Sequence, residues 1–212
     1  MTRKRFWCDP YLPRLDTRVS SVSGDMITVE ETIFYAASGG QESDAGTIGG
    51  HRVEEAILED SEIYYRLETG HGLSVEDPVE IAIDWQRRYR LMRLHFAAEV
   101  VLELVYRDFG PVEKTGAHIA ENKARIDFVW EGNISTILPL LSERSHQIFE
   151  SDLPIQSAFS DKAKQRRYWR VDGFAQVPCG GTHLRRTGEV GSIRLKRNNP
   201  GKGRERIEIT LA

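Results

Sequence analysis

The chain has 212 residues, of which 40% are hydrophobic and 29% charged, with a formal net charge of −3 at pH 7. This composition predicts a globular protein with its own hydrophobic core and excludes a disordered or low-complexity chain. No stretch approaches the ~20 apolar residues that span a bilayer, and the first residues lack the apolar segment of a secretion signal. We therefore expect a soluble protein of the cytoplasm, without a membrane partner.

Short strands separated by turns are predicted for residues 19–84, where turn-forming residues recur at short intervals. This pattern indicates a small N-terminal subdomain that is β-barrel-like. The period changes after Asp84: apolar residues such as Leu91, Leu94 and Ala98 recur every three or four positions until Gly110, which predicts an amphipathic helix. We place a domain boundary there, with a β-rich subdomain at residues 1–84 and a second domain at residues 85–212.

The second domain mixes both kinds of element, so we predict the α+β class. An extended stretch is expected at residues 124–130, followed by a helix from about Ile134 to Phe149, with Asn133 as a possible N-cap and Pro139 restricting its first turns. The last third returns to strands, and the turn NNPGKG between SIRLKR and RERIEITL predicts a hairpin.

The end of the chain is basic although the whole chain is slightly acidic. The side chains that we assign to nucleic-acid binding are Arg185, Arg186, Lys196, Arg197, Lys202 and Arg204. A polarised chain of this kind can meet a phosphate backbone with one face. Solvated side chains on a hairpin would explain the same charges equally well.

Two short motifs carry residues that can ligate a metal. His95 and Glu99 lie four positions apart on the predicted helix, so both side chains project from one face. Cys179 and His183 flank two glycines and a threonine in CGGTH, and zinc accepts such mixed sulfur, nitrogen and oxygen ligands. Either pair alone is weak evidence, since a histidine near an apolar stripe is more often a core residue. One shared site requires the helix to lie beside CGGTH, close enough for one ion to touch both.

A third motif, TIFYAASGGQESDAG at residues 32–46, contains Thr32 and Gln41. Its glycines let backbone approach a ligand closely, and the Gln41 amide offers both a donor and an acceptor to a polar substrate. A plain hairpin turn explains the glycines equally well, but it does not explain the whole string.

These stretches resemble one known family, the editing domains of alanyl-tRNA synthetase and their freestanding relatives, the AlaX proteins. The match runs in order through DPYL, TIFYAASGGQESDAG, RLMRLHFAAE and VPCGGTHLRRTGEVG, with KGRERI after it, and so covers nearly the whole chain. The length, with no aminoacylation domain, is similar to that of a freestanding editor. The resemblance implies an α+β editing domain of the threonyl- and alanyl-tRNA synthetase type at residues 85–212.

The resemblance also implies a reaction: hydrolysis of the ester between a mischarged amino acid, serine or glycine, and the 3′ end of alanine tRNA. It implies a zinc ion held by His95, Cys179 and His183, because the family has HxxxH on the helix and CxxxH near the end. Thr32 would sense the seryl hydroxyl, and Gln41 would lie at the editing pocket. The basic hairpin would hold the acceptor end of the tRNA. Whether the protein is a monomer or a homodimer is not indicated.

Glu99 departs from the family, which has a histidine at its position. Glutamate is an acceptable zinc ligand, so Glu99 either replaces a nitrogen ligand with an oxygen or stays unligated and orients the attacking water as a general base. We prefer ligation because it keeps the family geometry. The alternatives are a tRNA-binding paralogue that has lost catalysis and a deacylase of a different aminoacyl ester. A metallopeptidase is disfavoured, since the chain lacks HExxH.

Overall fold

The computed structural model describes residues 1–201 and 203–212. The chain divides into two compact units, the first made of Met1–Ser38 and Glu42–Tyr89 and the second of Gly39–Gln41 and Arg90–Ala212. The domain boundary at residue 84 stays a prediction. In the part of the chain that the structure describes, no helix is both long and apolar enough to cross a membrane.

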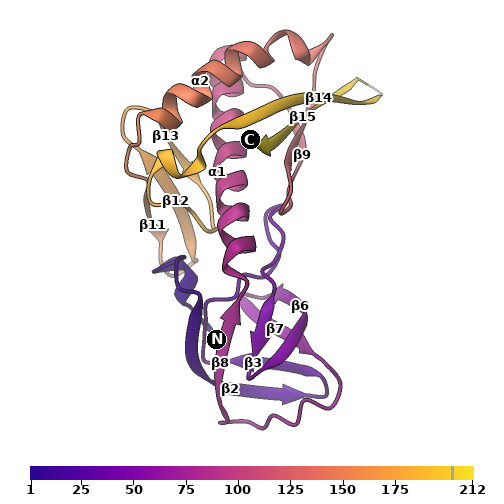
Figure 1. Cartoon of the computed structure of the whole chain (residues 1–212), viewed down its shortest axis with the longest axis vertical. Coiled ribbons are helices and arrows are strands. Elements are labelled where there is room, and N and C mark those ends of the chain that lie inside the picture. Colours follow the sequence, from indigo (N-terminus) through magenta and orange to yellow (C-terminus); the bar gives the residue numbers. More distant parts are fainter. Residues whose placement is uncertain (202) are drawn as a thin grey trace. The chain divides into compact units, whose positions relative to one another are not determined.

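The first unit is built from strands that close into a ring (Figure 1). Its elements are β1 (Arg3–Lys4), η1 (Arg5–Trp7), β2 (Arg14–Ser23), β3 (Met26–Val29), β4 (Glu31–Thr32), β5 (Gly46–Ile48), β6 (His51–Glu59), β7 (Glu62–Leu67) and β8 (Pro78–Ile83). The barrel has the strand order β2-β3-β7-β6-β5-β8, and β1 pairs with β4 in parallel beside it. Alternate residues of β8, Val79, Ile81 and Ile83, are buried, which is the two-residue period of a half-buried strand. The predicted β-barrel-like subdomain is confirmed.

A buried ion pair lies in the first unit. The Arg88 guanidinium donates to both carboxylate oxygens of Asp44 and to the carbonyl oxygens of Ile33, at 2.6 Å, and Pro10, at 2.9 Å. Both charged side chains are fully buried. Asp44 also accepts a hydrogen bond from the backbone nitrogen of Tyr35 at 2.7 Å. This network therefore ties together the residues that precede and follow SGGQ at residues 38–41.

The second unit contains most of helix α1 (Trp85–Phe109) and two sheets. Its other elements are β9 (Lys114–Ile119), β10 (Ala124–Val129), η2 (Ile134–Thr136), α2 (Leu138–Glu150), β11 (Gln156–Asp161), β12 (Arg166–Val171), β13 (Ala175–Pro178), η3 (Thr187–Val190), β14 (Ile193–Gly201) and β15 (Arg204–Leu211). One sheet has the order β14-β15-β10-β9 and the other β11-β12-β13. Figure 1 shows β14 and β15 as a long hairpin, as predicted from NNPGKG.

The apolar stripe of α1 is buried in the second unit, as its periodicity predicts. Leu91, Leu94 and Val105 are all fully or almost fully buried. The Phe96 ring packs edge-on against Trp169 of β12, with 5.1 Å between ring centroids. These contacts fix the rotation of α1 about its axis, and so decide which of its side chains face the second sheet.

One helix differs from the prediction. The segment expected as one helix from Ile134 to Phe149 is divided into the short 3-10 helix η2 and the α-helix α2. Asn133 does act as a cap, since its side chain accepts a hydrogen bond from the backbone nitrogen of Ser135, but it caps η2. Pro139 lacks the N–H that would bond to the carbonyl of Ser135 in a continuous α-helix, and it occupies the first turn of α2 instead.

Candidate metal centre

Four side chains from two places in the sequence meet in the second unit. His95 and Glu99 project from α1, while Cys179 and His183 come from the CGGTH turn that follows β13. One potential ligand atom from each residue lies within 4.8 Å of the others. The structure therefore brings together the two pairs of residues that the sequence singled out, although they lie about 80 residues apart.

Contacts outside the cluster hold the two elements in place. The Arg93 guanidinium of α1 donates two hydrogen bonds, of 3.0 and 2.7 Å, to the carbonyl oxygen of Val190 in η3. The backbone nitrogen of Cys179 donates to the carbonyl oxygen of Arg167 in β12 at 2.9 Å. The turn is thus anchored to β12 before the motif and to α1 after it.

The spacing of the four residues fits a metal ion. The distances are 3.5 Å from Cys179 Sγ to His95 Nε2, 3.4 Å from His95 Nε2 to Glu99 Oε1, and 3.5 Å from Glu99 Oε2 to His183 Nε2. Zinc bonds of about 2.0 to 2.3 Å in a tetrahedron separate neighbouring ligand atoms by about 3.3 to 3.8 Å. These three contacts, which involve both Glu99 oxygens, lie in that range, and the set with one atom from each residue lies within 4.8 Å. Within the described residues, Glu99 Oε2 and His183 Nε2 are buried and have no hydrogen-bond partner. These are the properties expected of atoms that ligate an ion.

The electrostatics of the cluster favour a positive charge at its centre. Burial lowers the pKa of the His95 imidazole, but the charges of Glu99 and Cys179 outweigh burial and raise it well above its usual value. Burial likewise opposes charge on His183, yet Cys179 and Glu99 raise its pKa. Despite burial, His95 and His183 lower the pKa of the Glu99 carboxyl. The Cys179 thiol is buried too, but the attraction of His95 brings its pKa to about 7. A divalent cation would supply the charge that both anions attract.

Polar side chains surround the four candidate ligands. The Ser157 hydroxyl lies 3.3 Å from His183 Nδ1. Gln41 pairs with Ile119 at the end of β9, and its Nε2 donates to Thr182 Oγ1 at 3.2 Å. Thr182 lies within the CGGTH motif, so its presence near the site follows from the sequence. No pattern in the sequence pointed to Ser157, which lies 26 residues from His183 on β11.

Thr32, the predicted sensor of the seryl hydroxyl, lies in the core of the first unit. It is fully buried, and its hydroxyl lies 2.6 Å from Tyr65 Oη and accepts a hydrogen bond from the backbone nitrogen of Phe34 at 3.0 Å. Tyr65 in turn donates to the carbonyl oxygen of Phe34 at 3.3 Å. The Thr32 hydroxyl is therefore already part of a hydrogen-bond network, and its predicted role stays a prediction.

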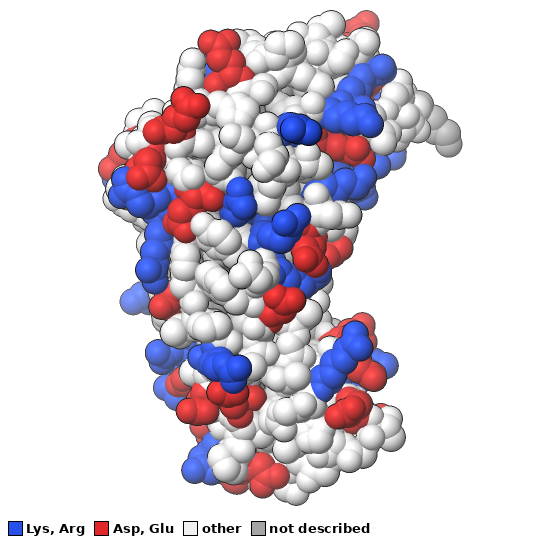
Figure 2. Space-filling view, viewed as in Figure 1, with Lys and Arg blue, Asp and Glu red and all other residues white. Residues whose placement is uncertain are grey.

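The residues assigned to nucleic-acid binding differ in their contacts. Arg186 pairs with Asp152 at 2.7 Å, and Arg197 of β14 pairs with the buried Glu205 of β15 at 2.5 Å. Three others are exposed to solvent: Arg185, Lys196 and Arg204. Lys202 lies outside the described residues. Figure 2 shows basic and acidic side chains interspersed over this face of the second unit. The basic character of the segment is thus partly neutralised by ion pairs.

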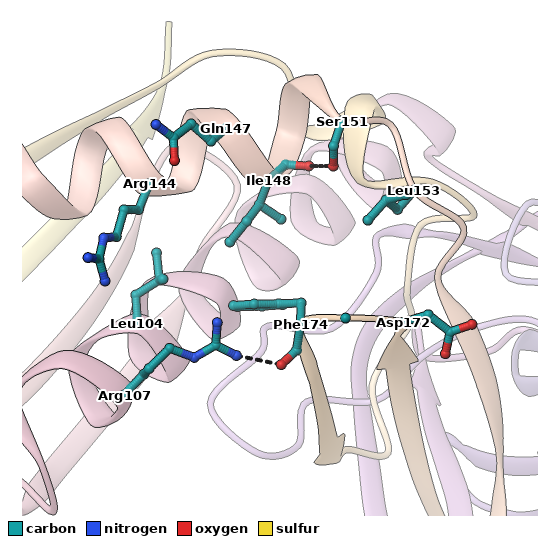
Figure 3. Close-up of a pocket in the computed structure, with 10 residues that line it drawn as sticks. Leu104, Arg107, Arg144, Gln147, Ile148, Ser151, Leu153, Asp172 and Phe174 are labelled. Atoms are coloured by element: carbon teal, nitrogen blue, oxygen red, sulfur yellow. Dashed lines mark hydrogen bonds between the residues drawn. The ribbon is translucent and has the colours of Figure 1, made fainter.

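A hollow of about 430 Å³ lies elsewhere in the second unit, between α1, α2 and the turn after β12. Figure 3 shows the Leu104, Ile148 and Leu153 side chains around it, with the Phe174 ring at its edge. The Arg107 guanidinium lies over that ring and donates to the carbonyl oxygen of Phe174. The residues that line this hollow include none of the four candidate ligands, so it is separate from the metal centre.

Comparison with known proteins agrees with the motifs. Residues 170–208 match the family described as threonyl and alanyl tRNA synthetase second additional domain. The whole chain is 31% identical to the alanyl-tRNA editing protein AlaX-M of Saccharolobus solfataricus, covering 99% of it, and 31% identical to AlaX-M of Pyrococcus horikoshii, covering 98%. It is 27% identical to the alanine–tRNA ligase of Methanococcus aeolicus, over 99% of this chain but 25% of the ligase. The resemblance seen in the sequence is confirmed, and the chain belongs to the AlaX-M family of alanyl-tRNA editing proteins.

Proposed function

We propose that this chain hydrolyses the ester between a mischarged serine or glycine and the 3′ end of alanine tRNA, acting in trans on tRNA charged by another protein. The observation that carries the proposal is the gathering of His95, Glu99, Cys179 and His183 within 4.8 Å in a member of the AlaX-M family. A cytoplasmic location, expected from the sequence, suits this role because charged tRNA is made and used there.

Zinc is the metal that the donor set supports best. One thiolate, two imidazoles and one carboxylate form a mixed set that zinc accepts in tetrahedral geometry. Glu99 is proposed as a ligand, since each of its oxygens lies within 3.5 Å of an imidazole nitrogen of the cluster. A zinc ion bound there would supply a Lewis acid that polarises the ester carbonyl.

The chain itself would mainly position the substrate. An aminoacyl ester is more reactive than an amide, so holding the carbonyl and a water in line accounts for much of the required acceleration. Hydrogen bonds discriminate a seryl hydroxyl from an alanyl methyl better than packing does. If Thr32 provides this discrimination, its oxygen would accept from the seryl hydroxyl with the lone pair that its bonds to Tyr65 and Phe34 leave unused.

Phosphate contacts are assigned to the basic segment near the end of the chain. Arg185, Lys196 and Arg204 are exposed and suited to bind the acceptor end of the tRNA. Arg186 and Arg197 are already in ion pairs, so any contact that they make with phosphate competes with Asp152 or Glu205.

Deacylation assays test the proposal directly. Alanine tRNA charged with serine, glycine or alanine is incubated with the zinc-loaded wild-type protein, with Cys179→Ala and with Cys8→Ala. Cys8 is the matched control because it is a free, exposed cysteine of the first unit. We expect the seryl or glycyl ester to decay faster than the alanyl ester with the wild type and Cys8→Ala, and no faster than in buffer with Cys179→Ala. The proposal is refuted if neither the seryl nor the glycyl ester decays faster with the wild type than in buffer.

A second candidate is a tRNA-binding paralogue that has lost catalysis, and Glu99 in place of the family histidine motivates it. Elemental analysis of the purified protein separates the two. About one zinc per chain supports the hydrolase, whereas absence of any stoichiometric metal favours the binding protein.

A further inference from the structure

One nitrogen of His95 faces the metal centre and the other faces away from it. His95 Nε2 lies 3.5 Å from Cys179 Sγ and 3.4 Å from Glu99 Oε1, so Nε2 is the candidate ligand atom. An imidazole that binds a metal through Nε2 carries its hydrogen on Nδ1, and this N–H is usually bonded to an acceptor that fixes the ring. Here His95 Nδ1 is buried, and no described atom accepts a hydrogen bond from it.

In the part of the chain that the structure describes, the Gln41 side chain has a buried acceptor without a donor. Its side chain is almost fully buried, and its Nε2 donates to Thr182 Oγ1 at 3.2 Å. This bond directs Gln41 Oε1 away from Thr182. Oε1 is an acceptor that is sealed from solvent and has no hydrogen-bond partner among the residues described.

Gly181 shows that the two unpartnered atoms face the same small space. A Cβ atom added to Gly181 would lie 2.2 Å from His95 Cε1, 2.8 Å from His95 Nδ1 and 3.2 Å from Gln41 Oε1. Any side chain at this position would therefore collide with the His95 ring. The neighbouring Gly180 differs, because a Cβ added there meets nothing within 4 Å. Gly181 is needed for the space it leaves.

We infer that Gln41 positions His95: its Oε1 accepts the Nδ1–H of His95, directly or through one buried water, and Thr182 holds the amide in the required orientation. The inference rests on the proposed metal centre. Gln41 would orient the metal ligand His95 without binding the metal itself. The arrangement parallels that of His183, whose Nδ1 has the Ser157 hydroxyl as its partner. Each candidate ligand histidine would then have its own orienting side chain.

Zinc affinity and the protonated nitrogen of His95 test this inference without tRNA. Zinc is titrated against a chelator in the wild type, Gln41→Leu, Thr182→Val and Thr182→Ser, with Gln147→Leu as control for loss of a glutamine elsewhere in the second unit. Loss of an orienting partner costs about 10- to 100-fold in metal affinity. We expect such a loss in Gln41→Leu, a smaller one in Thr182→Val, and near wild-type affinity in Thr182→Ser and Gln147→Leu.

Nitrogen-15 NMR of the zinc-loaded proteins gives a second readout. We expect a His95 Nδ1–H signal that exchanges slowly with solvent in the wild type and in Thr182→Ser, and its loss in Gln41→Leu. Unchanged zinc affinity together with a retained signal in Gln41→Leu would overturn the inference. If Gln41→Leu does not fold, as judged by circular dichroism, the same comparison is made between Thr182→Val and Thr182→Ser, and equal affinities then overturn it.

The outcomes also separate this inference from the proposed function. If the wild type deacylates neither seryl- nor glycyl-charged alanine tRNA but Gln41→Leu loses zinc affinity, the proposed function fails and the positioning role stands. If the wild type deacylates seryl- or glycyl-charged alanine tRNA and Gln41→Leu binds zinc normally and keeps the His95 signal, the proposed function stands and the positioning role fails.

Discussion

Replacing Arg88 with methionine is expected to destabilise the first unit strongly. The substitution keeps most of the apolar stem and removes the guanidinium that bonds to Asp44, Ile33 and Pro10. Among the residues that the structure describes, the fully buried Asp44 carboxylate then keeps only its hydrogen bond from the Tyr35 backbone. Arg88→Met therefore leaves a buried negative charge without a countercharge.

The size of the effect follows from this burial. Breaking a buried ion pair by removing one partner costs about 3–5 kcal/mol. For a chain of about 200 residues each kcal/mol lowers the melting temperature by about 2–4 °C, so the loss is roughly 6–20 °C. Replacing both partners, as Arg88→Met with Asp44→Leu, is expected to recover part of the loss, because no uncompensated charge remains.

Circular dichroism and calorimetric melting at neutral pH measure these differences. Arg14→Met is the matched control: Arg14 lies 2.5 Å from Glu80, but their side chains are 67% and 45% exposed, and such surface pairs contribute about 0–1 kcal/mol. A melting temperature of Arg88→Met within about 2 °C of that of Arg14→Met would show that the buried pair stabilises the protein no more than the exposed one.

Three further results are expected. Glu99→Ala should bind zinc at least about tenfold more weakly than the wild type, while Glu99→His, which restores the family residue, should keep it; unchanged zinc affinity in Glu99→Ala would argue against ligation by Glu99. Gly181→Ala should lower the free energy of unfolding in urea by about 1–3 kcal/mol, because its Cβ overlaps the His95 ring, whereas Gly180→Ala should change it little. Arg204→Ala should reduce the slope of log binding constant against log salt for tRNA by about 1, and an unchanged slope would remove Arg204 from the interface.

Features with a local signal in the sequence could be predicted. The buried stripe of α1 follows from its three- and four-residue period, and the hairpin of β14 and β15 follows from NNPGKG, although β14 continues to Gly201. The metal cluster could be anticipated because histidine, cysteine and glutamate are the usual zinc ligands and because the family motifs occur in order. The stripe and the hairpin need no knowledge of long-range contacts, whereas the meeting of the two ligand pairs, 84 residues apart, is predicted from the family motifs.

Features that depend on distant partners could not be predicted. Arg88 reads as one more charged residue of an amphipathic helix until Asp44, 44 residues away, is placed against it. The basic segment similarly reads as available charge, but Glu205 and Asp152 neutralise Arg197 and Arg186. Side-chain pairing across a fold has no short-range pattern in the sequence. The number of basic residues in a segment therefore overestimates the positive charge that is available to bind a ligand.

The glutamate in the cluster changes the charge of the proposed site. With a divalent metal, one thiolate and two or three neutral imidazoles leave a net charge of +1, whereas replacing one imidazole with the Glu99 carboxylate makes the site neutral. A neutral site holds its metal with more electrostatic attraction but withdraws less charge from an ester carbonyl. More of the rate acceleration must then come from fixed geometry, and rigid orientation of His95 by Gln41 and of His183 by Ser157 gains in importance. Gln41→Leu should therefore reduce the deacylation rate by a smaller factor in a Glu99→His background than in the wild type.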